Sequence, residues 1–220
     1  MAAFFVTGSG TDIGKTFICA GLLAHWRARG LAPAAFKPVV SGFDMADAEG
    51  SDPAVLLRAL GRPVTQDQLK TITLERFKAP LSPDQAAALE GRAISLAPLV
   101  ATCRKMAERP GPVLIEGAGG VMTPLNVETT MLDLAVALGL PVVFVAGSYL
   151  GALSHALTGL AAIEGRGLKL AAVIVNESAE GSVGLGQTCI SLKGRTKAPI
   201  VAVPRDAPSK VWTELSAALL

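Results

Sequence analysis

A glycine-rich loop near the start of the chain has residue types and a spacing that fit phosphate chemistry. Residues 8–16 read GSGTDIGKT and lie between a short apolar run and a helix-like pattern. In such a loop the backbone N–H groups surround phosphates, the lysine contacts the terminal phosphates and the threonine hydroxyl binds magnesium. The usual spacing has its first glycine at position 9, so this loop, which begins at Gly8, is one residue longer. Because Gly14-Lys15-Thr16 is intact, the loop predicts phosphate binding.

A carboxylate follows another apolar run. Glu116 ends the run 113–116 and is followed by the residues GAGG. A carboxylate at the end of a strand can hold magnesium in phosphate-binding proteins, and the glycines behind it allow a ligand to approach the backbone. The alternative is a glutamate that only caps the next turn. We favour the metal site, because the carboxylate would reach the same sheet edge as the phosphate loop.

A second lysine, Lys37, ends a third apolar run and has Ser41 close behind it. One lysine suffices to bind a nucleotide, so a second one indicates that further negative charge develops during the reaction, as in phosphoryl transfer to an acid. Taken alone, Lys37 would be a solvated strand end. Asp52, directly before Pro53, would by itself be an ordinary helix cap.

Short apolar runs alternate with longer helical patterns along the chain. The strand candidates are residues 4–7, 34–37, 113–116, 142–146, 170–176 and 200–203. The helix candidates are residues 53–60, 83–90, 96–108, 131–138, 151–164 and 208–220, besides a helix after the loop in which Ile18, Leu22, Leu23 and Trp26 share one face. Runs that are apolar on both faces are typical of parallel strands covered by helices on both sides. We therefore expect an α/β fold of the P-loop NTPase type, with a doubly wound, mostly parallel sheet, whose ligands bind beyond the carboxyl ends of the strands.

Two stretches need separate interpretation. Residues 134–153 carry no charge and are as long as a membrane span. Gly139 and Pro141 stop a helix there and a strand pattern follows, so we expect no span. Residues 177–197 contain four glycines and predict a loop with at most a short helix.

The composition limits the classes of partner. Lys plus Arg number 20 and Asp plus Glu 18, so no overall field attracts nucleic acid or a membrane surface. Cys19, Cys103 and Cys189 form no Cys-x-x-Cys pair, which argues against a zinc site and a disulfide framework. The 220 residues favour one domain over 1–220, and the first seven lack the pattern of a signal peptide. We expect a cytoplasmic protein.

Taken together, these residues resemble the dethiobiotin synthetases over most of the chain. The matching pieces are residues 6–16, Lys37-Pro38-Val39 with Ser41-Gly42, Ser51-Asp52, residues 79–83, residues 116–120 with 123–125, Gly147 with Leu150-Gly151 and His155, and Asn176. Few of these pieces are specific on their own, but their order and spacing together are specific.

The resemblance implies ring closure on 7,8-diaminopelargonic acid with CO2 and ATP. In this family one substrate amine captures CO2 as a carbamate, which takes the γ-phosphoryl group of ATP. The second amine then attacks the mixed anhydride, and ADP and phosphate are released. The resemblance thereby accounts for the second lysine.

The resemblance also implies roles for individual residues. The catalytic set would be Lys37, Lys15, Thr11 and Ser41. The nucleotide would contact Thr11, Asp12, Ile13, Gly14, Lys15 and Thr16, with Asn176 at the adenine edge and Pro204 as a lip. Mg²⁺ would be held by Thr16, Asp52 and Glu116.

For the substrate, the resemblance implies Lys37 and Ser41 together with a helix start, namely Gly151, Ala152, Leu153 and Ser154. Family members are homodimers in which the neighbouring subunit donates that helix start to the substrate carboxylate, which suits its free N–H groups. His155 is left out of the site, because a lone histidine on a helix is more often structural. The chain departs from the family pattern at Asp84, Tyr149 and Ser154, which affects the expected carboxylate contacts.

Three other functions share parts of this pattern. A partition or positioning ATPase, a P-loop switch protein, usually has an extra lysine early in the loop, and Lys37 and Ser41 would then lack a purpose. A cobyrinate-type amidating synthetase needs an attached glutaminase domain, or ammonia, and 220 residues leave no room for that domain. A degenerate P-loop binding module would not keep every expected polar position filled.

Overall fold

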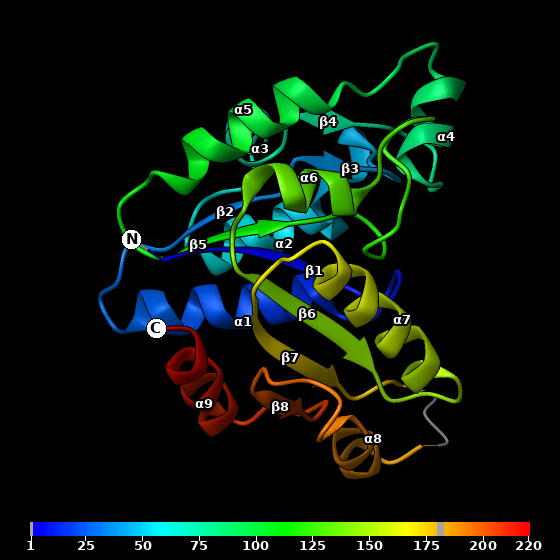
Figure 1. Ribbon diagram of the computed structural model, residues 1–220. Helices are drawn as coiled ribbons and strands as arrows, with labels where there is room; N and C mark the ends of the chain where they lie inside the picture. Colours follow the sequence, from blue (N-terminus) through cyan, green and yellow to red (C-terminus); the bar gives the residue numbers. More distant parts are fainter. Residues whose placement is uncertain (1, 180–182) are drawn as a thin grey trace.

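The computed structural model describes residues 2–179 and 183–220, and its centre is a six-stranded sheet. All neighbouring strands pair in parallel, in the order β2-β5-β1-β6-β7-β8 (Figure 1). The strands are β1 (Ala3–Gly8), β2 (Ala34–Phe36), β5 (Val113–Glu116), β6 (Val142–Gly147), β7 (Leu170–Asn176) and β8 (Ile200–Val203). Every strand expected from the sequence is present, which confirms the predicted fold class.

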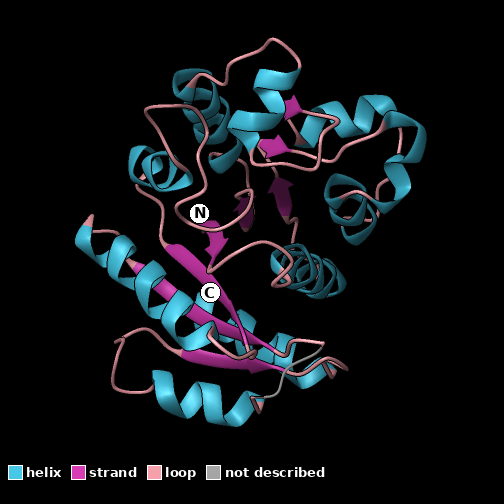
Figure 2. Cartoon of the chain, turned by 90° about the vertical axis from the view of Figure 1, so that its right-hand side faces the viewer, coloured by secondary structure: helices cyan, strands magenta, loops and turns pink. Residues whose placement is uncertain are grey.

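Helices cover both faces of this sheet (Figures 1 and 2). One face packs against α1 (Lys15–Ala28), α2 (Asp52–Ala59), α3 (Gln66–Ile72) and α9 (Ser209–Leu219). The other face packs against α4 (Pro83–Leu89), α5 (Leu96–Ala107), α6 (Met131–Leu138), α7 (Ala152–Gly165) and α8 (Leu185–Leu192). Each strand contributes to the core on both faces of the sheet, because successive side chains point to opposite faces. In β1, for example, Phe4 and Val6 join the core of the first face and Phe5 joins that of the second.

Three small elements were not predicted from the sequence. They are the 3-10 helix η1 (Met45–Gly50), the helix α3, and a two-stranded parallel sheet of β3 (Val39–Val40) and β4 (Glu75–Arg76). Strands of two residues are too short to show an alternating pattern. These elements matter because they hold the segment behind β2: the Lys37 amide donates to the carbonyl of Ile72 at 2.8 Å, and the Gly42 amide donates to that of Ala79 at 3.0 Å.

The ambiguous stretches have ordinary structures where they are described. Residues 134–153 divide into the end of α6, a turn with Gly139 at φ 66°, the buried strand β6, and a short loop that leads into α7. Among residues 2–179 and 183–220, no helix is long and apolar enough to cross a membrane. The stretch 177–197 contains the short helix α8, and its residues 180–182 lie outside the described part.

The phosphate loop leaves the sheet between β1 and α1 at a point where only glycine fits. A Cβ on Gly8 would overlap the carbonyl oxygen of Val145 on the neighbouring strand β6. At the other end of the loop, Gly14 caps α1 with φ at 94°, in the left-handed region that favours glycine. The loop can therefore pass close over the sheet edge and turn directly into the helix.

Candidate active site

Most of the predicted polar residues meet in one cavity of about 290 Å³ beyond the carboxyl ends of the strands. It is lined by Thr11, Asp12, Gly14, Lys15, Thr16, Lys37, Asp52, Glu116 and Gly119. These residues come from the phosphate loop, from the ends of β2 and β5, and from the start of α2. The parallel sheet brings them together, because the strands that precede them end at the same edge.

The loop is shaped to hold an anion. The first N–H groups of α1 have no partner within the helix, as at any helix start, and they point toward the loop. Within the loop, Asp12 has a positive φ of 55°, a conformation that Asp adopts more readily than most residues. The ammonium group of Lys15 donates to the Gly10 carbonyl at 2.7 Å, so the lysine lies folded over the loop.

A buried ion cluster occupies the floor of the cavity. Lys37 Nζ donates to Glu116 Oε1 at 2.7 Å and forms a second ion pair with Asp52. The hydroxyl of Thr16 donates to the same Glu116 oxygen at 2.6 Å. Lys37 is only 4% exposed and Glu116 only 1%. Glu116 therefore does not cap the next turn, and Lys37 is not a solvated strand end; Lys37 lies one residue beyond β2.

The cap of α2 also differs from its simplest interpretation. Ser51 is the N-cap residue, and its hydroxyl accepts from the Ala54 amide at 3.4 Å. Asp52 is the first residue of the helix, and its carboxylate is turned to Lys37. The capping role that Asp52 could have had is filled by its neighbour, which leaves its carboxylate for the cavity.

Thr16, Asp52 and Glu116 suit a divalent cation. They offer one hydroxyl and two carboxylates, the oxygen ligands that Mg²⁺ prefers, and phosphates and water usually complete its shell. Among the described residues, Glu116 Oε2 is buried without a hydrogen-bond partner. A buried acceptor of this kind is costly unless a cation or donor satisfies it. The donor set thus fits a magnesium ion bound with a nucleotide.

The two lysines have opposite electrostatic settings. Burial favours the neutral amine of Lys37, but the charges of Glu116 and Asp52 outweigh burial and raise its pKa. For Lys15, burial and the nearby charge of Lys37 lower the pKa to about 8. Asp52 is the reverse case: burial alone would raise its pKa, but the Lys37 charge lowers it. Lys37 is thus a fixed cation, whereas Lys15 holds its proton weakly until an anion approaches.

Not every predicted site residue lines this cavity. Ile13 is buried in the core, so only its backbone faces the loop, and its carbonyl accepts from Asn176 Nδ2 at 3.0 Å. Ser41 follows β3 and is half-buried. Pro204 directly follows β8, whose last residue, Val203, pairs with Asn176 on β7. Gly151 is the N-cap of α7, and Ala152, Leu153 and Ser154 form its first turn, away from the 290 Å³ cavity.

A second cavity of about 400 Å³ adjoins the first at Thr11, which lines both. Its other lining residues are Ser9, Gly10, Gly120, Val121, Met122, Thr123, His155, Thr158 and Gly159. His155 was not predicted as a site residue, yet its Nδ1 lies 2.8 Å from the Tyr149 hydroxyl, so the ring is held at the cavity wall. No local pattern could reveal this, because the cavity wall is built from three separate segments.

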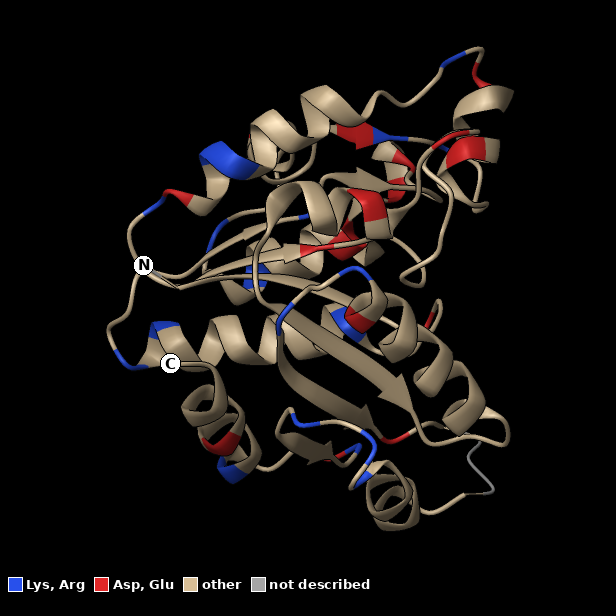
Figure 3. Cartoon of the chain, viewed as in Figure 1, with Lys and Arg blue, Asp and Glu red and all other residues tan. Residues whose placement is uncertain are grey.

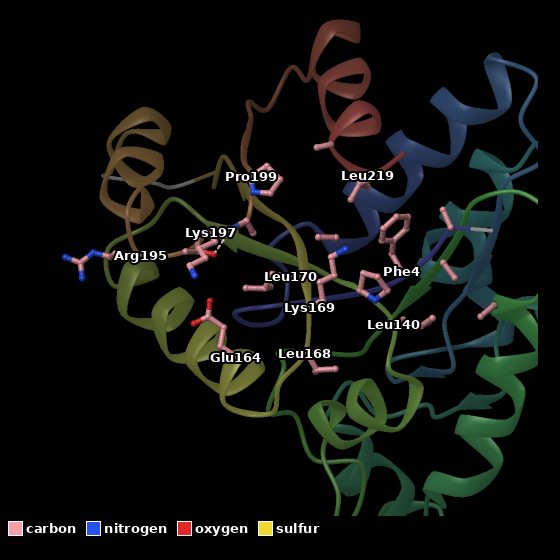
Figure 4. A pocket seen from close by; sticks show the side chains of 18 of the residues that line it. Phe4, Leu140, Glu164, Leu168, Lys169, Leu170, Arg195, Lys197, Pro199 and Leu219 are labelled. Atoms are coloured by element: carbon pink, nitrogen blue, oxygen red, sulfur yellow. Dashed lines mark hydrogen bonds between the residues drawn. The ribbon is translucent and has the colours of Figure 1, made fainter.

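A larger hollow lies at the opposite edge of the sheet and has no comparable chemistry. Figure 4 shows this groove of about 1420 Å³ where the strands begin. Its apolar residues include Phe4, Leu140, Leu168, Leu170 and Leu219, and Glu164, Lys169, Arg195 and Lys197 stand around them. These four charged residues are exposed to water. Charges of both signs are also spread along the rest of the chain (Figure 3), in agreement with its small net charge.

Comparison with protein families and curated relatives points to one enzyme family. A family model described as an AAA domain matches residues 2–208. The ATP-dependent dethiobiotin synthetase BioD of Caulobacter vibrioides is 49% identical over 208 residues, which cover 93% of each chain. The enzyme of the same name from Phenylobacterium zucineum is 44% identical and covers all of this chain and 95% of its own.

Solved structures with similar folds are more distant in sequence. MinD in the MinC:MinD complex of Aquifex aeolicus has a TM-score of 0.60 at 13% identity, covering 99% of this chain and 96% of its own. The hydrogenase maturation factor HypB of Archaeoglobus fulgidus has a TM-score of 0.58 at 12% identity, covering 100% and 91%. At such identities the likeness concerns the fold alone.

Proposed function

The chain belongs to the ATP-dependent dethiobiotin synthetases, and on this basis we propose which substrates it takes and which residues act on them. The substrates are 7,8-diaminopelargonic acid, CO2 and ATP, and the products are dethiobiotin, ADP and phosphate. The observation that carries the proposal is the buried cation Lys37, which shares one 290 Å³ cavity with the phosphate-loop lysine, Lys15. A nucleotide switch needs only the phosphate-loop lysine, Lys15.

ATP binds with its phosphates at the loop. The N–H groups at the start of α1 and the ammonium group of Lys15 neutralise the phosphate charge. Mg²⁺, held by Thr16, Asp52 and Glu116, would supply further positive charge to the phosphate oxygens. Asn176 and Pro204, at the ends of β7 and β8, face the adenine, and Asp12, Ile13 and Gly14 surround the phosphates through their backbone.

Lys37 acts where the two negatively charged reactants meet. A carbamate oxygen forms a bond to the γ-phosphorus while the bond from that phosphorus to the ADP oxygen breaks. The second amine then attacks the carbamate carbon, and phosphate leaves as the ring closes. Lys37 balances the charge that gathers on the transferring phosphoryl group and the carbamate, with Thr11 and Ser41 as hydrogen-bond donors beside it. Such stabilisation is effective here because Lys37 is buried.

The aliphatic arm of the substrate extends away from Lys37. The 400 Å³ cavity that adjoins the reaction site at Thr11 has room for such an arm. The carboxylate at the end of the substrate's aliphatic arm reaches a helix start of a second subunit, formed by Gly151, Ala152, Leu153 and Ser154. The working form is therefore a homodimer. The free N–H groups of a helix start suit a carboxylate, and the preceding Leu150 is 82% exposed, which is consistent with a covering partner.

The protein works in the cytoplasm, where ATP and CO2 are available.

The test is phosphate release from Mg-ATP in bicarbonate, with and without 7,8-diaminopelargonic acid. We expect release to depend strongly on the diamine and the product to support growth of a biotin auxotroph. Release that does not respond to the diamine would instead favour a partition or positioning ATPase, a class with the same fold.

A further inference from the structure

Phe17 is an exposed aromatic residue directly beside the phosphate loop. It directly follows Thr16 in the first turn of α1, yet its side chain is 42% exposed. The other large apolar residues of this helix, among them Ile18, Leu22 and Trp26, are fully buried. Phe17 is therefore not part of the buried core. Its position beside the phosphate loop suggests that it contacts a ligand.

Phe17 is paired with a second aromatic side chain from the far end of the sequence. The rings of Phe17 and Trp212, on α9, have centroids 5.6 Å apart and planes at 63°, an edge-to-face arrangement that such rings prefer. Trp212 also lies close against α1 one turn beyond Phe17, since a Cβ added to Gly21 would overlap the indole ring. Glycine at this position lets the indole approach the helix backbone, so the pair is held in place from both helices.

The pair joins α1, which begins at the phosphate loop, to α9, which follows Pro204 in the chain. Phosphates bound at the start of α1 lie beside Phe17. Asn176, at the end of β7, touches the loop through its hydrogen bond to the Ile13 carbonyl. β8 pairs with β7 so that Val203 stands opposite Asn176, and the chain then runs through Pro204 into α9, which carries Trp212. A nucleotide that extends from the loop toward Asn176 and Pro204 therefore passes the Phe17–Trp212 pair.

We propose that Phe17 and Trp212 form an aromatic wall that packs against the base or ribose of the bound nucleotide. The proposal rests on the proposed function in placing the phosphates at the loop and the adenine toward Asn176 and Pro204. Aromatic side chains bind nucleobases by stacking, which tolerates different bases because every base has a π-face. The wall thus adds affinity for the nucleoside part of ATP and contributes nothing to the phosphate part.

The test separates these two parts by titrating the protein with ADP and with inorganic tripolyphosphate. In Trp212→Leu and Phe17→Leu, we expect ADP to bind roughly tenfold more weakly in calorimetry, as the loss of a stacking partner implies, and tripolyphosphate to bind as in the wild type. Trp212→Phe should recover most of the ADP affinity. Glu214→Gln, an exposed neighbour on α9, is the matched control and should change neither.

Fluorescence gives an independent readout, because the chain has only two tryptophans and Trp26 is fully buried. ADP should change the emission of Trp212, whereas tripolyphosphate should not. Unchanged ADP affinity in both leucine variants would overturn the wall, and so would an equal loss of ADP and tripolyphosphate binding. Failure of the wild type to bind either ligand would instead overturn the proposed function.

Discussion

At the residue scale, Lys37 is the side chain whose surroundings say most about the reaction. It is buried between Asp52 and Glu116, so removing its charge leaves both carboxylates without their cationic partner, and the Glu116 carboxylate is itself buried. An ion cluster kept only for stability could be replaced as a whole by well-packed apolar residues at little cost. Its place in the same cavity as Lys15 indicates a role in the chemistry.

Lys37→Ala should therefore separate binding from turnover. We expect ATP to bind nearly as in the wild type, while kcat falls by about 100-fold or more, because the interaction is strongest in the transition state. Calorimetry with ATP and steady-state phosphate release measure the two effects. Lys70→Ala, which removes an exposed lysine on α3, serves as the control. Equal losses of binding and turnover would show that Lys37 is a ground-state contact.

The same ion cluster makes a prediction about divalent cations. Lys37 Nζ bonds one oxygen of each carboxylate, so its positive charge repels a cation that binds to the other oxygens of Asp52 and Glu116. Lys37→Met should for this reason bind Mn²⁺ alone more tightly than the wild type, as measured by electron paramagnetic resonance. Adding Asp52→Asn should reverse the gain. If Lys37→Met binds Mn²⁺ no better, the carboxylates are not the cation ligands.

Lys15 predicts a proton effect of definite sign. Its pKa is about 8 in the folded protein, below the usual value for lysine, so its charged form is only partly populated at pH 8. Bound phosphates favour the charged form and raise this pKa, so on ADP binding Lys15 should take up protons at pH 8 and almost none at pH 6.5. Calorimetry in two buffers of different ionisation enthalpy measures the uptake. Lys15→Arg, which stays protonated, should abolish it.

At the element scale, the turn from the phosphate loop into α1 depends on the backbone of Gly14. Its φ of 94° disfavours any other residue, and a Cβ there would overlap the side chain of Asn176. The turn and the predicted adenine contact are thus linked: Asn176 can reach the loop only because residue 14 has no side chain.

Gly14→Ala should both destabilise the fold and weaken ADP binding. We expect a loss of about 1 to 3 kcal/mol in the free energy of unfolding, from left-handed strain and the overlap with Asn176. The control is Gly139→Ala, which also has a positive φ, 66°, but no atom within 4 Å of the added Cβ. Urea unfolding should show a cost in both variants, and only Gly14→Ala should lose ADP affinity. Equal ADP binding in the two variants would contradict the role of this turn.

At the scale of the whole molecule, the substrate site is proposed to span two subunits, each giving what the other lacks. The prediction is that Lys37→Ala and Gly151→Val are each nearly inactive, but that mixing and reassembling them restores roughly a quarter of the activity, since half of the dimers then contain one intact site. Sedimentation checks the dimer and phosphate release checks the recovery. No recovery in mixed dimers would place the carboxylate contact within one subunit. The expectation of one domain over residues 1–220 stays a prediction.

Some of this protein could be predicted from the sequence because the signals are local. The phosphate loop is one contiguous segment, 8–16, with its lysine and threonine at a set spacing. The apolar runs of the inner strands β1, β5 and β6 are buried on both faces, as their composition indicates. A local pattern also identified Glu116 and Lys37, since each stands where such a run ends. Elements with weak patterns were missed: β3 and β4 have two residues each, and α3 has seven.

Only the tertiary structure decided how distant side chains meet. Lys37 and Glu116 are 79 positions apart, and their bond depends on β2 pairing with β5. The contact of Phe17 with Trp212 depends on α9 packing against α1, and the wall of the second cavity depends on α7. Such contacts form because burial of apolar faces selects one arrangement of the elements, a property of the whole core that no short segment carries. Local chemistry could therefore be predicted from the order of the residues, whereas the partners of each charged or aromatic group followed from the packing.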